Sequence, residues 1–140
     1  MKKQYSLLII DDEPGIIDAY GRYFKKRGFR VDNAQDGQSG LNKLLDGEYD
    51  VALVDLRMPE LDGIKVIQQA VEADVSASLV ILTGHGEKQD AVDAVNYGAD
   101  AWFDKGSEDM KPIFDKVKAL AEGMPLDDIS KALANLSDEA

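Results

Sequence analysis

The sequence predicts an α/β fold, a doubly wound, five-stranded parallel sheet with helices on both faces. Three four-residue apolar runs have the β-branched and leucine character of strands covered on both sides: Leu7–Ile10, Val51–Val54 and Leu79–Leu82. Stretches with apolar residues at helical spacing follow each of them. Such alternation of strand and helix is typical of right-handed crossovers within one parallel sheet.

Two further strands are less apolar or shorter. Phe29–Asp32 alternates apolar and polar residues, and Ala101–Phe103 runs directly into Asp104 and Lys105. Both patterns are typical of strands at the edge of a sheet. Because these edge strands are the second and the fifth along the chain, the sequence predicts the order 2-1-3-4-5 of flavodoxin-like sheets.

Boundary residues and apolar stripes indicate five helices. The first begins near Pro14 and ends at Gly28, with basic residues in its last turn, where positive charge is favoured. Asp62 is a candidate N-cap for the third helix. The stripes of the remaining four helices are Leu41, Leu44 and Leu45; Ile64, Ile67, Ala70 and Val71; Ala91, Val92 and Val95; and Ile113, Val117 and Leu120, after Pro112.

The composition excludes several classes of function. The 140 residues can bury one sizeable core, and 16 basic against 27 acidic residues give a net charge of −11. Direct nucleic-acid binding needs a basic surface, so it is disfavoured. Cysteine is absent, which excludes disulfides, thiolate zinc sites and cysteine nucleophiles. The apolar run Leu7–Ile10 is too short for a signal peptide or a membrane span, so we expect a cytoplasmic protein.

Acidic residues follow two strands that are neighbours in the predicted order. Asp11, Asp12 and Glu13 come after the first strand, and Asp55 ends the third. Beyond the carboxyl ends of the strands these carboxylates converge, and their repulsion raises a pKa unless a hard cation such as Mg²⁺ is bound. Taken singly, each aspartate is better explained as a solvated turn residue or a helix cap.

The ends of the other strands favour a phosphoryl site. Thr83 and Gly84 follow the fourth strand, and Lys105 follows the fifth. An acidic cluster, a hydroxyl and a lysine at one edge suit chemistry in which a carboxylate attacks phosphorus while cations neutralise the phosphoryl oxygens. The plainer alternative for each is a strand-end hydroxyl bonded to nearby backbone and a solvated surface lysine.

These motifs resemble the receiver domains of bacterial two-component response regulators, the CheY-like family. The resemblance covers about residues 5–121 and rests on Asp11–Pro14, Asp55–Gly63, Thr83-Gly84, Gly98–Ala101 and Lys105. It implies that Asp55 accepts a phosphoryl group, that Asp11, Asp12, Asp55 and the carbonyl of Arg57 hold Mg²⁺, and that Thr83 and Lys105 contact the phosphoryl group. The donor would be a histidine kinase or a histidine phosphotransfer protein. The domain would be a signalling domain that catalyses only its own phosphorylation and dephosphorylation.

The resemblance also implies a switch. Trp102 stands three positions before the lysine, where the family carries a relay aromatic residue. Movement of the Thr83 hydroxyl toward phosphate would make room for Trp102 and change the face formed by the fourth helix, fifth strand and fifth helix, which would dock an output domain or a target protein. Trp102 is equally well interpreted as a half-buried aromatic on an edge strand.

Three positions differ from the family or vary within it. Gly106 follows Lys105 where most members have proline, so we expect either that the loop takes another route or that Lys105 is less firmly placed. Arg57 and His85 stand two residues after Asp55 and Thr83, at the mouth of the site, where they are expected to tune the lifetime of the aspartyl phosphate. For His85 a plain loop histidine is the favoured interpretation, because nothing else in the sequence completes a histidine site.

The sequence predicts a receiver domain over residues 1–121 and a tail over 122–140. Gly123-Met124-Pro125 breaks the fifth helix, and Leu126, Ile129, Leu133 and Leu136 then recur at helical spacing. A short helix of this kind needs a partner. It can pack on its own domain, pair in a homodimer, or begin a linker to an output module.

Three rival hypotheses stay open. A haloacid-dehalogenase-like phosphohydrolase uses similar residues, but its nucleophile follows the first strand and its acid pair comes late, the reverse of Asp55 and Asp11-Asp12. A flavodoxin-like cofactor protein needs a first loop that attracts phosphate, which this acidic loop repels. A degenerate receiver that serves only as an interaction module is disfavoured by the intact acids, hydroxyl and lysine.

Overall fold

The computed structural model describes residues 4–84, 88–105 and 109–123, in which strands and helices alternate five times along the chain. Among these residues, none of the helices combines the length and the apolar character that crossing a bilayer requires. The elements are β1 (Ser6–Ile10), α1 (Pro14–Lys26), β2 (Arg30–Ala34), α2 (Gly37–Asp46), β3 (Val51–Asp55), α3 (Gly63–Glu72), β4 (Ser78–Thr83), α4 (Lys88–Asn96), β5 (Ala101–Asp104) and α5 (Lys111–Ala121).

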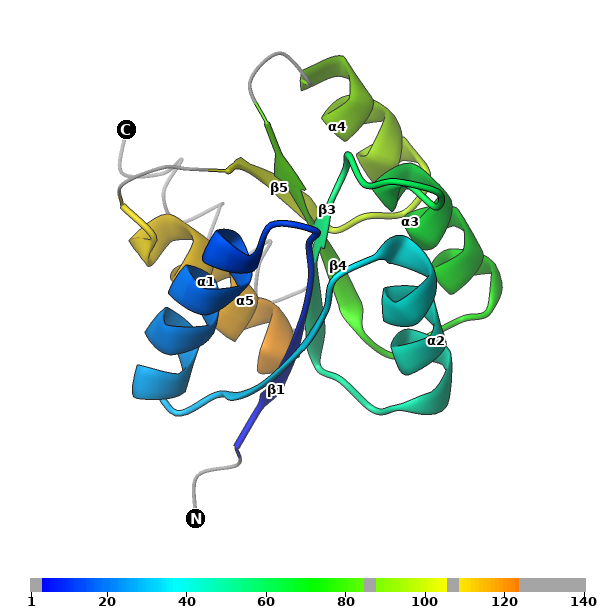
Figure 1. The fold of residues 1–140 in the computed structure, drawn as a ribbon. Coiled ribbons are helices and arrows are strands. Elements are labelled where there is room, and N and C mark those ends of the chain that lie inside the picture. Colours follow the sequence, from blue (N-terminus) through cyan, green and yellow to red (C-terminus); the bar gives the residue numbers. More distant parts are fainter. Residues whose placement is uncertain (1–3, 85–87, 106–108, 124–140) are drawn as a thin grey trace, which may run out of the picture.

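The strands form one sheet in the order β2-β1-β3-β4-β5, and every neighbouring pair is parallel. This confirms the predicted fold class, including the two edge strands (Figure 1). The register brings the carboxyl ends of the strands to one edge of the sheet, since Ile10 pairs with Val54 and Thr83 pairs with Asp104. Residues that directly follow β1, β3, β4 and β5 therefore leave the sheet on the same side.

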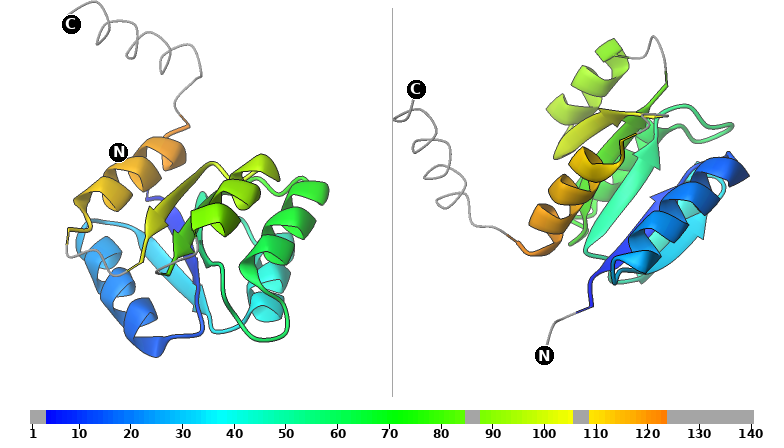
Figure 2. Two further views of the ribbon diagram at one scale, coloured as in Figure 1. Left: turned by 90° about the horizontal axis from the view of Figure 1, so that it is seen from above. Right: turned by 90° about the vertical axis from the view of Figure 1, so that its left-hand side faces the viewer.

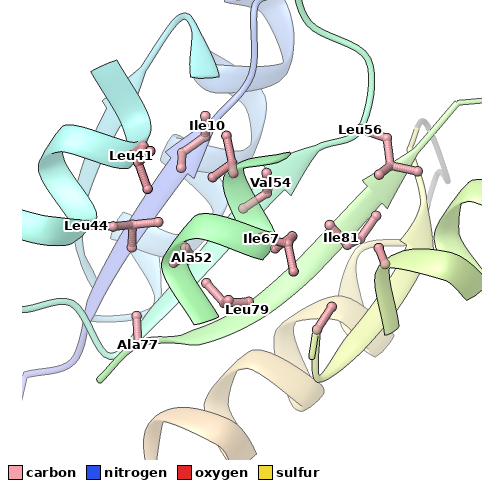
Figure 3. Packing of buried hydrophobic residues seen from close by; sticks show 14 of the residues in the cluster. Ile10, Leu41, Leu44, Ala52, Val54, Leu56, Ile67, Ala77, Leu79 and Ile81 are labelled. Carbon is pink, nitrogen blue, oxygen red and sulfur yellow. The ribbon is translucent and has the colours of Figure 1, made fainter. Parts of the chain in front are cut away.

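The core has two layers, one on each face of the sheet. Helices α2, α3 and α4 cover one face, and α1 and α5 cover the other (Figures 1 and 2). Alternate strand residues supply the two layers: Ile10 and Val54 pack toward α2 and α3, as Figure 3 shows, whereas Ile9 and Leu53 pack toward α1 and α5. Both faces of the central strands are buried, as their unbroken apolar runs predict.

The limits of β2 differ from the sequence prediction of Phe29–Asp32. The strand covers Arg30–Ala34, paired with Ser6–Ile10 of β1. Phe29 belongs to the turn after α1, because its N–H donates to the carbonyl of Phe24 (3.1 Å) and its ring packs on Phe24 and Phe114 with centroids 5.2 and 5.9 Å apart. Packing in this aromatic cluster therefore holds Phe29 outside the sheet, and β2 begins at the next residue.

Helix boundaries follow from local chemistry. The predicted cap of α3 is confirmed: the Asp62 carboxylate accepts the N–H of Lys65 at 3.0 Å. Asp36 caps α2 in the same way, accepting from Ser39 at 2.7 Å. Gly28 ends α1 with φ of 92°, a conformation that glycine adopts without steric strain.

Candidate functional site

Three carboxylates meet at the carboxyl edge of the sheet. Asp11 follows β1 and is fully buried, Asp55 ends β3 and is 2% exposed, and Asp12 is exposed beside them. One oxygen from each lies within 4.8 Å of the other two. The predicted convergence of Asp11, Asp12 and Asp55 is confirmed, and it follows from the parallel register of β1 and β3.

Lys105, which follows β5, reaches the acidic cluster with its ammonium group. Its N–H donates to the carbonyl of Thr83 (2.7 Å), which extends the β4–β5 ladder by one step and fixes where the side chain starts. Its Nζ lies 3.1 Å from Asp55 Oδ2, 3.1 Å from Asp11 Oδ2 and 2.9 Å from Glu13 Oε1, and the side chain is only 9% exposed. Gly106 lies outside the described residues, but Lys105 nevertheless reaches the acidic cluster.

The site is electrostatically strained. The pKa of Asp55 is raised to about 6: burial is the largest cause, the charge of Asp11 adds to it, and Lys105 acts in the opposite direction. Burial likewise raises the pKa of Asp11, although the N–H of Glu13 and the Lys105 ammonium lower it. The sequence predicts that mutual repulsion of the acids raises a pKa, but for both aspartates loss of hydration on burial is the larger cause.

The carboxylates also act on the lysine. Burial by itself lowers the pKa of Lys105, but its contacts with Glu13, Asp11 and Asp55 outweigh this and raise the pKa above its ordinary value. Lys105 therefore stays charged throughout the physiological pH range. One ammonium faces three carboxylates, which leaves this edge with an excess of negative charge.

The donor set fits a hard divalent cation. Magnesium takes oxygen ligands at about 2.1 Å, so two ligands on opposite sides of one ion lie about 4.2 Å apart, close to the spacing of the three aspartates. Asp11 Oδ2 is buried and receives no hydrogen bond within the described chain, although the Lys105 ammonium lies near it. A buried carboxylate oxygen in this state is a suitable metal ligand.

Thr83 and Trp102 lie on neighbouring strands beside the acids. Thr83 is buried, and its hydroxyl is 3.4 Å from the carbonyl of Phe103 and 3.3 Å from Asp104 Oδ1, so it donates weakly toward β5. Trp102 is partly buried and packs against the core layer under α4. This position agrees with a half-buried aromatic and leaves the relay interpretation a prediction.

Of the two residues expected at the mouth of the site, Arg57 and His85, the structure describes only Arg57. The N–H of Arg57 is 3.3 Å from Asp55 Oδ1, and its guanidinium forms an ion pair with Asp90 in the first turn of α4. His85 lies outside the described residues. The contact of Arg57 with Asp90 was not predictable, because no sequence pattern links residues 33 positions apart. The contact of Glu13 with Lys105 was not predicted either.

A cleft of about 480 Å³ lies away from this site. Its lining includes Tyr5, Arg27, Phe29, Phe114 and Lys118, from the turn after α1, the chain before β1, and α5. Asp11, Asp12, Asp55 and Lys105 do not contribute to its lining. The acidic cluster therefore lies outside this cleft.

This fold, with an acidic cluster and a lysine at the carboxyl edge, defines an α/β domain of the receiver class. Residues 7–118 match the family model described as response regulator receiver domain, and the chain belongs to that family. The transcriptional regulatory protein DltR of Streptococcus agalactiae is 33% identical over 102 residues, which are 73% of this chain and 46% of DltR. The chain thus spans about half the length of the curated relatives DltR and ArlR, and less of others.

Solved structures agree with this assignment. The crystal structure of FixJ-N superimposes with a TM-score of 0.79 at 26% identity, covering 89% of this chain and 98% of that one. The response regulator TrrA from Thermotoga maritima, solved in complex with Mg²⁺-BeF, gives a TM-score of 0.76 at 26% identity and covers 84% and 99%. Both comparisons extend over nearly the whole of the neighbouring structure.

Proposed function

We propose that this chain accepts a phosphoryl group on Asp55 from a phosphohistidine, in a reaction that depends on Mg²⁺, and thereby switches a protein-binding surface. One observation carries the proposal. A buried carboxylate lies 3.1 Å from a lysine ammonium, with oxygens of two further aspartates within 4.8 Å. This arrangement places a nucleophile and opposite charges where a phosphoryl group can meet both.

The transfer balances as a simple exchange of partners at phosphorus. A carboxylate oxygen of Asp55 bonds to phosphorus while the bond from phosphorus to the histidine nitrogen breaks, and the departing nitrogen keeps the electron pair and takes up a proton. With a pKa of about 6, Asp55 is mostly ionised at neutral pH and can attack. Lys105 neutralises phosphoryl oxygens, and Glu13 and Asp11 hold its ammonium in place.

The metal ligands proposed are Asp11, Asp12, Asp55 and the main-chain carbonyl of Arg57. A bound Mg²⁺ would supply positive charge to the phosphoryl oxygens and to the excess of carboxylates. The oxygen-only donor set supports this assignment, and so does the Mg²⁺-BeF complex named for TrrA.

The switch is proposed to run from Thr83 to Trp102. Within the described part of the chain, the contacts of the Thr83 hydroxyl with β5 are long, so a phosphoryl oxygen competes with them readily. Trp102 lies one strand away and packs under α4. The face formed by α4, β5 and α5 would then bind a target protein or an output domain.

Partners follow from the family. A histidine kinase or a phosphotransfer protein is the proposed donor, and relatives named as transcriptional regulators suggest that an output module acts downstream. We assign residues 1–121 to the receiver domain and 122–140 to a tail. The apolar residues of the tail, from Leu126 to Leu136, lie outside the described residues, so intramolecular packing, a homodimer and a linker stay as the three hypotheses.

The rival functions have less support. An acid pair after β1 and Asp55 at the end of β3 stand in the reverse of the order found in a haloacid-dehalogenase-like hydrolase. A degenerate receiver that only binds other proteins would not require a buried carboxylate with a raised pKa beside a lysine.

The test is incubation with acetyl phosphate and Mg²⁺, followed by intact-mass measurement of the wild type and Asp55→Asn. We expect one phosphoryl group on the wild type and none on the variant. Omission of Mg²⁺ is expected to abolish labelling. A wild type that stays unlabelled, or a variant that is labelled equally, would refute the proposal.

A further inference from the structure

Arg57 connects the acidic edge to α4. Its N–H is 3.3 Å from Asp55 Oδ1. Its guanidinium reaches the other way, and Nη2 lies 2.6 Å from Asp90 Oδ2. One residue therefore contacts both the proposed phosphoacceptor and the first turn of the helix that borders the proposed docking face.

This ion pair differs from the exposed pairs within helices, and it spans more of the chain than the pair of Lys43 with Asp32, which joins α2 to β2. Arg22 with Asp18 and Lys111 with Asp115 each span one turn of a single helix. Arg57 and Asp90 are 33 residues apart and join the loop after β3 to α4.

A phosphoryl group on Asp55 would compete for the same guanidinium. The phosphoryl group itself carries a charge of about −1.5 to −2 at neutral pH, and arginine binds phosphoryl oxygens with two parallel hydrogen bonds. The Asp90 pair is weak by comparison, because the side chain of Arg57 is 67% exposed and that of Asp90 is 34% exposed. The Asp90 ion pair therefore shifts the position of the Arg57 guanidinium only by a modest factor.

We propose that Asp90 is a positioning residue for Arg57: it holds the guanidinium at α4 and, after phosphorylation, competes with the phosphoryl group for it. This inference rests on the proposed phosphorylation of Asp55. When Arg57 is held by Asp90, the phosphorus is open to water. When Arg57 moves to the phosphoryl oxygens, it shields the phosphorus and leaves α4 without this tie.

The experiment measures the half-life of the phosphorylated protein by intact mass after acetyl phosphate is removed. Asp90→Asn keeps the shape of the side chain and removes its charge. Arg57→Ala removes the guanidinium but keeps the main-chain carbonyl proposed as a metal ligand. We expect Asp90→Asn to lengthen the half-life about twofold to fivefold, the range that one exposed ion pair supports, and to have no effect in the Arg57→Ala background.

Two controls separate this role from a general effect on the fold. Asp90→Glu keeps the charge and should restore the wild-type half-life, and Asp115→Asn breaks an exposed pair elsewhere and should leave it unchanged. An equal change in both backgrounds, or no change in either, overturns the inference alone. Absence of label on the wild type overturns the proposed function and this inference with it.

Discussion

Replacing Asp55 by Asn should stabilise the metal-free protein. Asp55 is 2% exposed, and its pKa of about 6 compares with 3.8 for an unperturbed aspartate. A difference of about 2 units corresponds to about 3 kcal/mol against folding once the group is ionised in both states. Because Lys105 loses one of its partners in the variant, we expect a net gain of about 1–3 kcal/mol in the free energy of unfolding at pH 7.5.

The sign of the pH dependence follows from the same shift. The folded-state pKa of Asp55 lies above the unfolded value, so between about pH 4 and pH 6 the folded protein binds more protons than the unfolded chain. Asp55 contributes its full share to the free energy of unfolding of the wild type below pH 4, and this contribution is lost as the pH rises through about 6. The advantage of Asp55→Asn should therefore be near zero at pH 4 and reach its full value above pH 6.

The assay is thermal or urea unfolding in EDTA, with Asp18→Asn as the control. Asp18 is exposed and its replacement makes the same change in net charge, so an effect within about 0.5 kcal/mol is expected there. At about 4 °C per kcal/mol for a domain of this size, Asp55→Asn should raise Tm by about 4–12 °C. If Asp55→Asn is less stable than wild type at pH 7.5 without metal, the argument that this carboxylate is strained is wrong.

Three further variants test the rest of the account. Asp12→Ala should reduce the rise in Tm that Mg²⁺ gives to the wild type, because bound metal favours the folded state in proportion to its affinity; an equal rise in both proteins would contradict the ligand assignment. Lys105→Met leaves Asp11 and Asp55 facing each other without a cation, so it should lower metal-free stability at pH 7.5 by about 1–3 kcal/mol and less at pH 5, where Asp55 is protonated; a loss that does not depend on pH would point to packing instead. Asp36→Ala should cost about 1 kcal/mol in urea unfolding through loss of the α2 cap, with no change in Mg²⁺ binding.

The fold was predictable because its signals are local. Apolar runs such as Leu7–Ile10 are buried on both sides, and the alternating pattern of strand and helix leaves few topologies for a parallel sheet. The limits of β2 were not, because Phe29 is bound by an aromatic cluster drawn from α1 and α5, which strand propensity does not report. Asp36 was not predicted as a cap either, although an aspartate directly before a helical stretch is a signal that could have identified it.

The site was predictable for a geometric reason. Residues that follow neighbouring parallel strands must leave the sheet at one edge, so Asp11 and Asp55 meet whatever the loops do. Contacts between loops are not fixed by the register of the sheet in this way. The reach of Lys105 to Glu13 and the pairing of Arg57 with Asp90 depend on the path of whole segments, which only the three-dimensional structure supplies.

The position of the phosphoryl group is the most direct test of the central claim. The protein labelled with acetyl phosphate and Mg²⁺ can be reduced with borohydride, which converts an aspartyl phosphate to homoserine, and the peptides can then be sequenced by mass spectrometry. The account predicts homoserine at position 55. Homoserine at position 11 or 12, or at no position in a protein that carries the label, would contradict it.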